Sequence, residues 1–592
     1  MRVADYIIER LVQAGIRHLF MVTGRGVLYL TDAAARNGDI SCVSVHHEQA
    51  GAYAAMAYAQ YNETLGACLV STGCAGANAV TGVLCAWQDE VPCLFVSGQN
   101  ALRETVRHTK LPVRTFGQQE ADIVSLVASI TKYAAMIEDP SRIAYEMDKA
   151  LHLAQSCPKG PVWVDVPLDI QNMPVEPGEL ARFEPDLAVL EAAQAEVARV
   201  HEALKAARRP VVLIGNGLRQ AGAVEELNRL AEAWRLPIVC AASAVDVYRS
   251  ERPLSLGVVG VLAANRAANF AVQNADFVLV VGHRLTSMTV GHAPEKFARA
   301  AKIAIVDIDA AEPKKGTVRA DMVIQADARD FLAKLNACEA HLTEVSWRDK
   351  CRHWQALFPK CDEERRKTEA VDLYCLAERL GEHLPGDGVL VCDAGLEELI
   401  VPTTVAFKAR QRCLHPVSQG AMGYALPAAV GAWLSGGRPT VAVIGDGSIM
   451  MNLQELQTIA HNQYPLKILV INNNGYAVIR GRQRDLFRSR TIGTDSSNGL
   501  SCPDFSQVAR AFGLRYERIG GSRELDEGLA KVLKAEEPVI CEIMSLERQD
   551  YLHSSFARDK TGKFVQRPLE DQSPFLDRDL FLAEMIIEPI DQ

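Results

Sequence analysis

Short, wholly apolar runs alternate along the chain with longer segments in which apolar residues recur at helical spacing. Residues 4–14 show the helical spacing, and apolar runs bounded by turn residues occupy 68–72, 93–98 and 162–167. Such short runs are typical of strands buried on both faces, as in a parallel sheet covered by helices. We therefore predict a first α/β domain over residues 1–175.

The same pattern returns twice. Strands, each followed by a turn rich in glycine or acidic residues, are predicted at 211–217, 277–282, 303–309, 389–395, 440–447 and 466–474. The first three predict a central Rossmann-like domain (190–340), and the last three predict a third domain (370–550), with a tail at 551–592. A proline-rich acidic stretch at 172–186 has the composition of an exposed linker. The predicted fold class is α/β, with three doubly wound parallel-sheet domains in series.

Composition and charge restrict the functional classes. A chain of 592 residues is too long for one hydrophobic core, and a formal net charge of −10 argues against nucleic acid as a partner. No run of about 18 apolar residues and no signal-type apolar block occurs, so we expect a cytoplasmic protein with no membrane partner. Fifteen cysteines at irregular spacings, without C-x-x-C, are expected to be buried thiols in a reducing cytosol.

A glycine-flanked aspartate follows one predicted strand, and an asparagine ends the next. Gly445-Asp446-Gly447 comes after 440–444, and Asn473 comes after 466–471. Loops at the carboxyl ends of adjacent parallel strands meet in one crevice, so Asp446 and Asn473 can offer oxygen ligands to one Mg²⁺. The glycines would let backbone N–H groups approach a diphosphate. Taken alone, however, Gly-Asp-Gly is also an ordinary strand-end turn.

A second constellation lies far upstream. Glu48 stands at the turn between a predicted strand, which begins at residue 43, and a helix-like segment rich in small residues. One interpretation of Glu48 is an acid at a helix N-terminus, stabilised by the helix dipole. The other interpretation is a carboxylate that belongs to an active site.

These two constellations together resemble the motifs of thiamine-diphosphate enzymes. The similarity continues in order along nearly the whole chain and is closest to the large, catalytic subunit of acetolactate synthase. Its clearest further segments are STGCAGANAVTG (71–82), QEADIV (119–124), KGPVWVDVPLD (159–169) and SQGAMGYALP (418–427).

The resemblance implies a role for individual residues. Asp446 and Asn473 would bind Mg²⁺ through their side chains and Gly475 through its carbonyl, while Glu48 would hydrogen-bond to N1′ of the aminopyrimidine ring. Met422 would wedge the cofactor into a bent shape, although a methionine here also fits plain core packing. The remaining predicted cofactor contacts are Gly73, Asn78, Gly395, Gly420, Gly445, Gly447 and Ser448. Gln118 and Gln119 join Glu48 as predicted catalytic residues.

This chain departs from the family at both substrate pockets. The family has a phenylalanine directly before the glutamine of QEADIV, where this chain has Gln118, so the donor pocket is predicted to be more polar. The family's acceptor-site methionine and tryptophan are replaced by Val478 and Arg482. Five arginines between 480 and 490 are either a solvated loop face or an anion-binding site. The second interpretation predicts an anionic acceptor, such as a keto nucleotide sugar.

The resemblance implies an enzyme dependent on thiamine diphosphate and Mg²⁺. It would decarboxylate pyruvate or a related 2-oxoacid and transfer the two-carbon unit to a second carbonyl compound. A 2-oxoacid decarboxylase, a C–C hydrolase, a 2-hydroxyacyl lyase and a non-catalytic homologue remain alternatives. FAD in the central domain is compatible with the glycines at 215–222, although the family's flavin-contacting methionine is Val258 here. A homo-oligomer, at least a dimer, is expected because the family builds its site from two chains.

Overall fold

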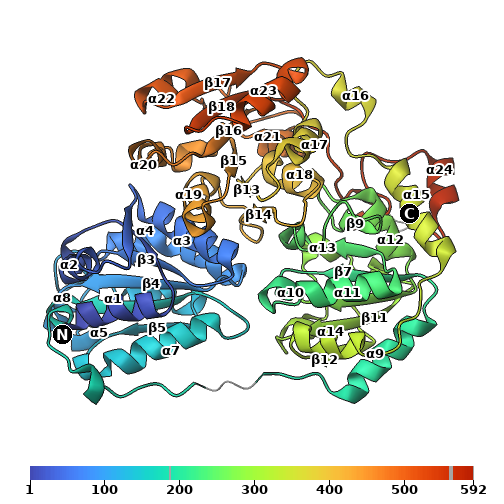
Figure 1. Cartoon of the computed structure of the whole chain (residues 1–592). Coiled ribbons are helices and arrows are strands. Elements are labelled where there is room, and N and C mark those ends of the chain that lie inside the picture. Colours follow the sequence, from blue (N-terminus) through green and yellow to red (C-terminus); the bar gives the residue numbers. More distant parts are fainter. Residues whose placement is uncertain (186–188, 559–563, 591–592) are drawn as a thin grey trace.

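Three six-stranded parallel sheets, each covered by helices, follow one another along the chain in the computed structural model (Figure 1), which describes residues 1–185, 189–558 and 564–590. The predicted fold class is therefore confirmed. The first and third sheets have the same topology, β2-β1-β3-β4-β6-β5 and β14-β13-β15-β16-β18-β17, whereas the central sheet is ordered β12-β11-β10-β7-β8-β9.

The first domain contains β1 (His18–Met21), β2 (Ser41–Ser44), β3 (Gly66–Val70), β4 (Cys93–Gln99), β5 (Tyr133–Met136) and β6 (Val162–Pro167). Its helices are α1 (Val3–Gln13), α2 (Leu28–Arg36), α3 (Glu48–Asn62), α4 (Cys74–Gln88), α5 (Val106–Thr109), α6 (Ile123–Val127), α7 (Ile143–Gln155) and α8 (Leu168–Gln171). Strand β6 coincides with the apolar run at 162–167, and all six of its residues are buried.

The central domain contains β7 (Pro210–Ile214), β8 (Ile238–Cys240), β9 (Ser255–Val258), β10 (Phe277–Val281), β11 (Lys302–Asp307) and β12 (Met322–Gln325). Its helices are α9 (Gln194–Ala206), α10 (Gly217–Gln220), α11 (Val224–Trp234), α12 (Arg266–Asn274), α13 (Ser287–Val290) and α14 (Ala328–Asn336). Helices α15 (Val345–Leu357) and α16 (Glu363–Arg366) lead to the third domain.

The third domain contains β13 (Val389–Cys392), β14 (Arg412–Leu414), β15 (Thr440–Gly445), β16 (Lys467–Asn472), β17 (Arg515–Ile519) and β18 (Val539–Met544). Its helices are α17 (Leu373–His383), α18 (Leu396–Thr404), α19 (Ala425–Gly436), α20 (Glu455–Asn462), α21 (Ala477–Leu486), α22 (Phe505–Ala511) and α23 (Leu525–Leu533). This domain lies across the other two (Figure 1) and shares one hydrophobic core with the first and another with the central domain.

Helix α3 of the first domain packs very closely against α19 of the third. A Cβ atom at Gly431 would lie only 2.0 Å from the carbonyl oxygen of Ala54, so the contact requires a residue without a side chain. The Tyr53 and Tyr424 rings meet edge to face, with their centroids 5.3 Å apart, beside this contact. The small residues that the sequence places after Glu48 therefore serve to bring two domains together.

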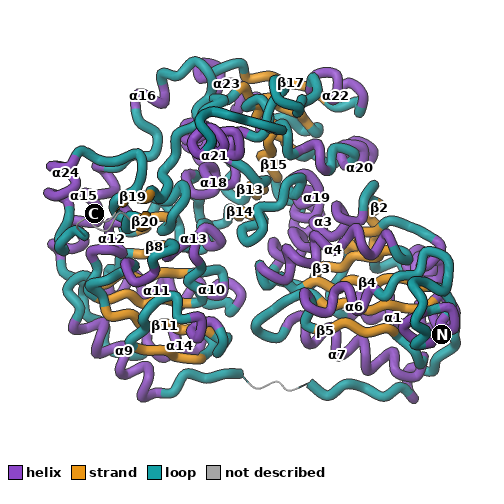
Figure 2. The backbone as a smooth tube through the Cα atoms, turned by 180° about the vertical axis from the view of Figure 1, so that it is seen from behind, coloured by secondary structure: helices purple, strands orange, loops and turns teal. Residues whose placement is uncertain are grey.

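The C-terminal segment folds back onto the central domain. It forms the hairpin β19 (Phe556–Arg558) and β20 (Phe564–Gln566), seen from behind in Figure 2, and the helix α24 (Arg578–Glu584). Glu570 is fully buried and its carboxylate lies 2.7 Å from the Arg299 guanidinium. Residues 564–590 are thus an integral part of the packing rather than a free extension.

The expectation of buried thiols is wrong in two respects. Cys361 and Cys375 form a disulfide that links the segment between α15 and α16 to α17. Cys42, Cys74 and Cys157 are exposed, because they lie at an edge strand, at the first residue of a helix and in a loop. Spacing along the chain could not reveal either result, since the disulfide partners meet only when α17 packs.

The predicted linker at 172–186 is irregular over 172–185 apart from a single 3₁₀ turn at Pro177–Glu179, and its last residue lies outside the described ranges. Among the residues that the structure describes, no helix has both the length and the apolar character needed to cross a bilayer.

Candidate active site

The first of two site clusters forms where α3 begins. Glu48 is the first residue of that helix, and its carboxylate accepts a hydrogen bond of 2.9 Å from the Asn78 side-chain amide on α4. Gly73, the residue directly before α4, has a positive φ, and a Cβ atom there would lie 1.9 Å from the Gln119 carbonyl oxygen. The structure therefore brings together Glu48, Asn78, Gly73 and Gln119, which the sequence separates by up to about 70 positions.

Gln118 lies at the rim of this cluster. Its side-chain oxygen accepts a hydrogen bond of 3.0 Å from Arg25, and its backbone oxygen accepts one of 2.8 Å from Asn100. Phe116, two residues earlier, is exposed. Gln118 is thus hydrogen-bonded within the first domain, and its place in a polar donor pocket stays a prediction.

The second cluster lies at the carboxyl ends of β15 and β16, which are neighbours in the third sheet. Asp446 is 1% exposed, and its two carboxylate oxygens accept hydrogen bonds of 2.9 Å from the backbone N–H groups of Gly447 and Gly475. Burial raises the pKa of Asp446 to about 6. A buried carboxylate of this kind is stabilised in its charged form by a bound cation.

Asn473 provides the clearest sign of a ligand at this point. Its side chain is buried, and its Oδ1 atom has no hydrogen-bond partner within the described residues. Buried polar atoms are almost always paired, so an unpaired amide oxygen beside a buried carboxylate fits a cation site built from oxygen ligands. The Gly475 carbonyl accepts a bond of 3.1 Å from Ala477 N–H, which leaves a second lone pair for a ligand. The residues present therefore fit Mg²⁺.

Glycines surround this cation site because the space beside them is already filled. A Cβ atom at Gly447 would lie 2.6 Å from the Tyr476 ring, and one at Gly445 would lie 2.5 Å from the Glu397 carboxylate. Gly395 has a φ of 116° and also packs against Glu397. Such bare backbone suits the close approach of a diphosphate.

The Gly420–Met422 segment precedes α19. Gly420 has a positive φ of 53°, and Met422 remains 38% exposed, which is unusual for a core methionine. The exposure favours the interpretation of Met422 as a ligand contact over plain packing.

Ser448 is a predicted cofactor contact, but its hydroxyl is hydrogen-bonded within the protein. Its side chain is buried and donates to the Asp393 carboxylate, while it accepts a bond of 3.2 Å from Gly423 N–H. Its hydroxyl therefore helps to support the loop, and its contact with a diphosphate stays a prediction.

Comparison with known proteins agrees with this geometry. Family models described as the N-terminal TPP binding domain, the central domain and the C-terminal TPP binding domain of thiamine pyrophosphate enzymes match residues 1–126, 197–335 and 393–543. The acetolactate synthase isozyme 3 large subunit of Escherichia coli (strain K12) is 31% identical, covering 90% of this chain and 92% of that protein. The chain belongs to the thiamine pyrophosphate enzyme family.

Within this family, the similar proteins are acetolactate synthases from distant sources. The enzyme of Arthrospira platensis is 30% identical, with 92% of this chain and 94% of that protein covered. The chloroplastic acetolactate synthase 1 of Zea mays is 29% identical, with 91% and 85% covered. The predicted family resemblance is confirmed, and it covers nearly the whole chain.

Sequence reasoning missed Asp393, which lies one residue beyond β13. Its fully buried carboxylate accepts hydrogen bonds from Gly423 N–H (2.9 Å), Ala425 N–H (2.7 Å) and the Ser448 hydroxyl. It therefore fastens the start of α19 to the loop that contains Asp446. An acidic residue directly after a buried strand, as at Asp446, was the available signal.

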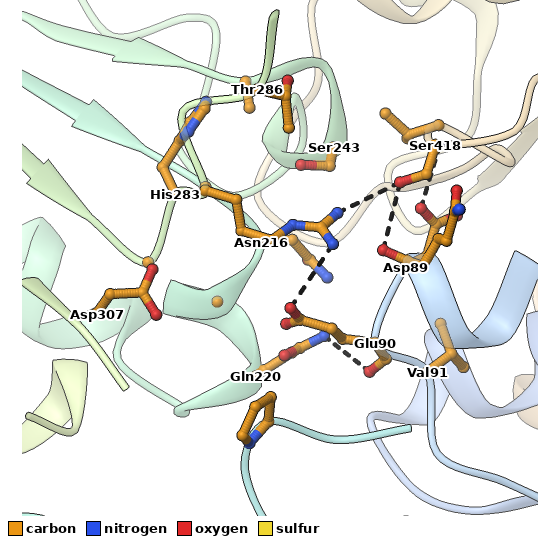
Figure 3. A pocket seen from close by; sticks show the side chains of 18 of the residues that line it. Asp89, Glu90, Val91, Asn216, Gln220, Ser243, His283, Thr286, Asp307 and Ser418 are labelled. Carbon is orange, nitrogen blue, oxygen red and sulfur yellow. Dashed lines mark hydrogen bonds and ion pairs between the residues drawn. The ribbon is translucent and has the colours of Figure 1, made fainter. Parts of the chain in front are cut away.

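A separate cavity of about 520 Å³ lies where the three domains meet (Figure 3). Its lining includes the turn around Asn216 after β7, Asp307 at the end of β11, Glu90 and Ser418. Arg284 lies 3.7 Å from the Glu90 carboxylate and donates a bond of 3.3 Å to the Ser418 hydroxyl. Val258, at the family's flavin-contacting position, does not line this cavity but belongs to a neighbouring one.

The cation site generates a direct prediction. Asp446→Ala should abolish Mg²⁺-dependent binding of thiamine diphosphate, because the diphosphate loses the cation that bridges it to the protein. Isothermal titration with thiamine diphosphate at fixed Mg²⁺ measures this effect, and Asp485→Ala, on the exposed face of α21, is the matched control. An unchanged affinity in Asp446→Ala would contradict the assignment of the metal site.

Proposed function

We propose that this protein is a thiamine-diphosphate and Mg²⁺-dependent enzyme that transfers a two-carbon unit from a 2-oxoacid to a second carbonyl compound. The observation that carries the proposal is the unpaired, buried Asn473 Oδ1 atom beside Asp446, at a strand end lined by glycines. Family membership and similarity to acetolactate synthases support the reaction type.

Each cluster has a separate task in this proposal. Asp446, Asn473 and the Gly475 carbonyl would hold Mg²⁺ against the diphosphate, and Glu48, oriented by Asn78, would exchange a proton with the pyrimidine ring. When bound, thiamine diphosphate supplies the electron sink for cleavage and formation of the carbon–carbon bond. The protein supplies position, charge and the exclusion of water.

We also propose that two chains complete each active site. Met422, Met450 and Met451 of the third domain and Phe116 of the first domain are all exposed in a single chain, although apolar side chains at a reacting centre are normally covered. A second copy that pairs its first domain with this third domain would cover both sets. Such a twofold arrangement produces two equivalent sites in each dimer.

A complementation experiment tests Glu48 and this arrangement together. Glu48→Gln alone should lower turnover at least about 100-fold, since an acid–base partner is lost. When Glu48→Gln and Asp446→Ala chains are co-expressed, mixed dimers would contain one intact site, and activity should recover to about a quarter of the wild-type value.

The two variants assayed separately are the controls for this recovery. Near-normal turnover of Glu48→Gln would remove Glu48 from the mechanism. Absence of recovery in verified mixed dimers would place Glu48 and Asp446 of one chain in the same site.

The acceptor is proposed to be anionic, such as a keto nucleotide sugar. Arg482 and Arg484 are exposed on α21, and Arg488 and Arg490 extend the positive charge along the following loop. Val478 is partly buried against the hydrophobic core, so it is less accessible to the acceptor than Arg482 is. An exposed guanidinium is suited to phosphate and carboxylate groups.

For this acceptor site, Arg482→Ala should lower kcat/KM for an anionic acceptor by roughly 10- to 150-fold, as expected for a lost charge-assisted contact. Decarboxylation of pyruvate without an acceptor should stay unchanged. Arg518→Ala, at an exposed position on the edge strand β17, is the control. Equal loss with charged and uncharged acceptors, or no loss at all, would return the arginines to the role of a solvated loop.

FAD is proposed for the cavity between the domains. Asp307, at the end of β11, would accept a hydrogen bond from a ribose hydroxyl of FAD. Arg284 would offer a positive charge to the FAD diphosphate. The purified protein should then show the visible absorbance of flavin, and Arg284→Ala should retain less of it. A colourless protein that fails to take up added FAD would contradict this proposal.

A further inference from the structure

One arginine of the basic stretch behaves unlike its neighbours. Arg480 is 1% exposed, whereas Arg482 and Arg484 on the same helix are exposed. An arginine is almost never fully buried unless its charge is paired and its N–H groups are bonded. The Arg480 side chain is therefore held by specific contacts and is not available to an acceptor.

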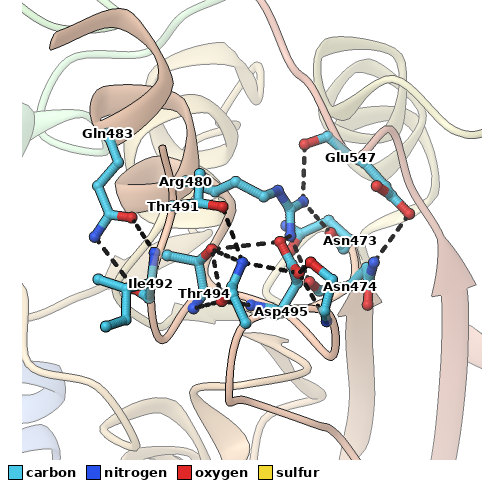
Figure 4. A network of polar contacts seen from close by, with 12 residues as sticks. Asn473, Asn474, Arg480, Gln483, Thr491, Ile492, Thr494, Asp495 and Glu547 are labelled. Carbon is cyan, nitrogen blue, oxygen red and sulfur yellow. Dashed lines mark hydrogen bonds and ion pairs between the residues drawn. The ribbon is translucent and has the colours of Figure 1, made fainter. Parts of the chain in front are cut away.

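Its contacts lie on the turn that follows β16 (Figure 4). The Nη2 atom donates bonds of 2.6 Å to the backbone oxygen of Asn473 and 3.0 Å to that of Glu547, and Nη1 donates to the backbone oxygen of Asn474. Asp495 lies 3.7 Å away and balances the charge. One guanidinium thus holds two successive carbonyls of the turn and joins them to the segment after β18.

The other side of the turn is held by the loop that contains Asp495. The Thr494 backbone oxygen accepts a bond of 2.9 Å from Tyr476 N–H, and it would lie 2.3 Å from a Cβ atom at Gly475. Asp495 is itself fixed by the Ser497 hydroxyl and the Asn498 side chain. The turn is therefore hydrogen-bonded to Arg480 on one side and to this loop on the other.

The turn carries two of the three proposed cation ligands, the Asn473 side chain and the Gly475 carbonyl. The backbone oxygens of Asn473 and Asn474 accept hydrogen bonds from the Arg480 guanidinium. The side-chain Oδ1 atom of Asn473, by contrast, has no hydrogen-bond partner among the described residues. Mg²⁺ demands near-ideal octahedral geometry at short distances, whereas Ca²⁺ accepts larger and more flexible sites. A rigid turn therefore favours Mg²⁺ over Ca²⁺ at this site.

We infer that Arg480 is a positioning residue that sets the size and metal preference of the cation site by fixing the Asn473–Gly475 turn, with Asp495 as its counter-charge. The inference rests on the proposed function of this site. It also removes Arg480 from the set of arginines that could bind an anionic acceptor.

The test compares Mg²⁺ and Ca²⁺ as partners for thiamine diphosphate. In Arg480→Met, the Mg²⁺ concentration for half-maximal binding of thiamine diphosphate should rise at least about tenfold, since charge-assisted bonds to the turn are lost. The Ca²⁺ requirement should change less than about threefold, because Ca²⁺ tolerates a looser site. Calorimetric titration gives both values, and Arg510→Met, at an exposed position on α22, is the matched control.

A purely structural role would appear differently. It would lower the metal-free melting temperature and raise the two metal requirements equally, and that result would overturn the inference, as would an unchanged Mg²⁺ requirement. If Arg480→Met does not fold, Arg480→Lys and Asp495→Asn replace it, and the same shift in the Mg²⁺ to Ca²⁺ ratio is expected. Wild-type protein without Mg²⁺-dependent binding would overturn the proposed cofactor site and this inference with it.

Discussion

The close contact between α3 and α19 is the constraint on which the rest of the arrangement depends. Helix α3 begins at Glu48, and α19 begins at Ala425, shortly after the Gly420–Met422 segment, so the packing of these two helices fixes one site cluster relative to the other. The approach is possible because Gly431 has no side chain to strike the Ala54 carbonyl. The small residues of α3 thus have an architectural role that affects the chemistry, because they set the spacing between the two half-sites that each chain contributes to the proposed dimer.

A group of buried carboxyl side chains is the second organising feature. Asp393, Glu397 and Asp446 all lie buried near the ends of β13 and β15, and burial raises the pKa of Asp393 to about 7 and that of Glu397 well above its ordinary value. Asp393 offsets its burial through four hydrogen bonds from three segments, which ties the start of α19 to the loop of Asp446. Asp446 has two backbone donors beside the unpaired oxygen of Asn473. A cation at this point would stabilise the charged form of Asp446.

The basic stretch shows how similar residues acquire different roles. Arg480 and Arg482 are two positions apart on α21, and side chains at that spacing point in different directions from a helix. One direction leads into the third domain, where backbone oxygens bind the guanidinium, and the other leads to solvent. Counting charges along the chain could not separate them, because the distinction depends on which face of α21 packs.

The sequence by itself determined the fold class, most of the central strands and the family. Runs such as 162–167 and 277–281 are buried throughout, so their apolar pattern can be read from the local sequence. Edge strands such as β12 and β17 are partly exposed and were not predicted. The strand-end motifs located Asp446 and Asn473 for the same reason. Only the tertiary structure decided the burial of Arg480, the coupling through Asp393, the disulfide and the cavity between the domains. Each of these joins segments far apart in the chain, and such contacts are set by packing geometry rather than by local pattern.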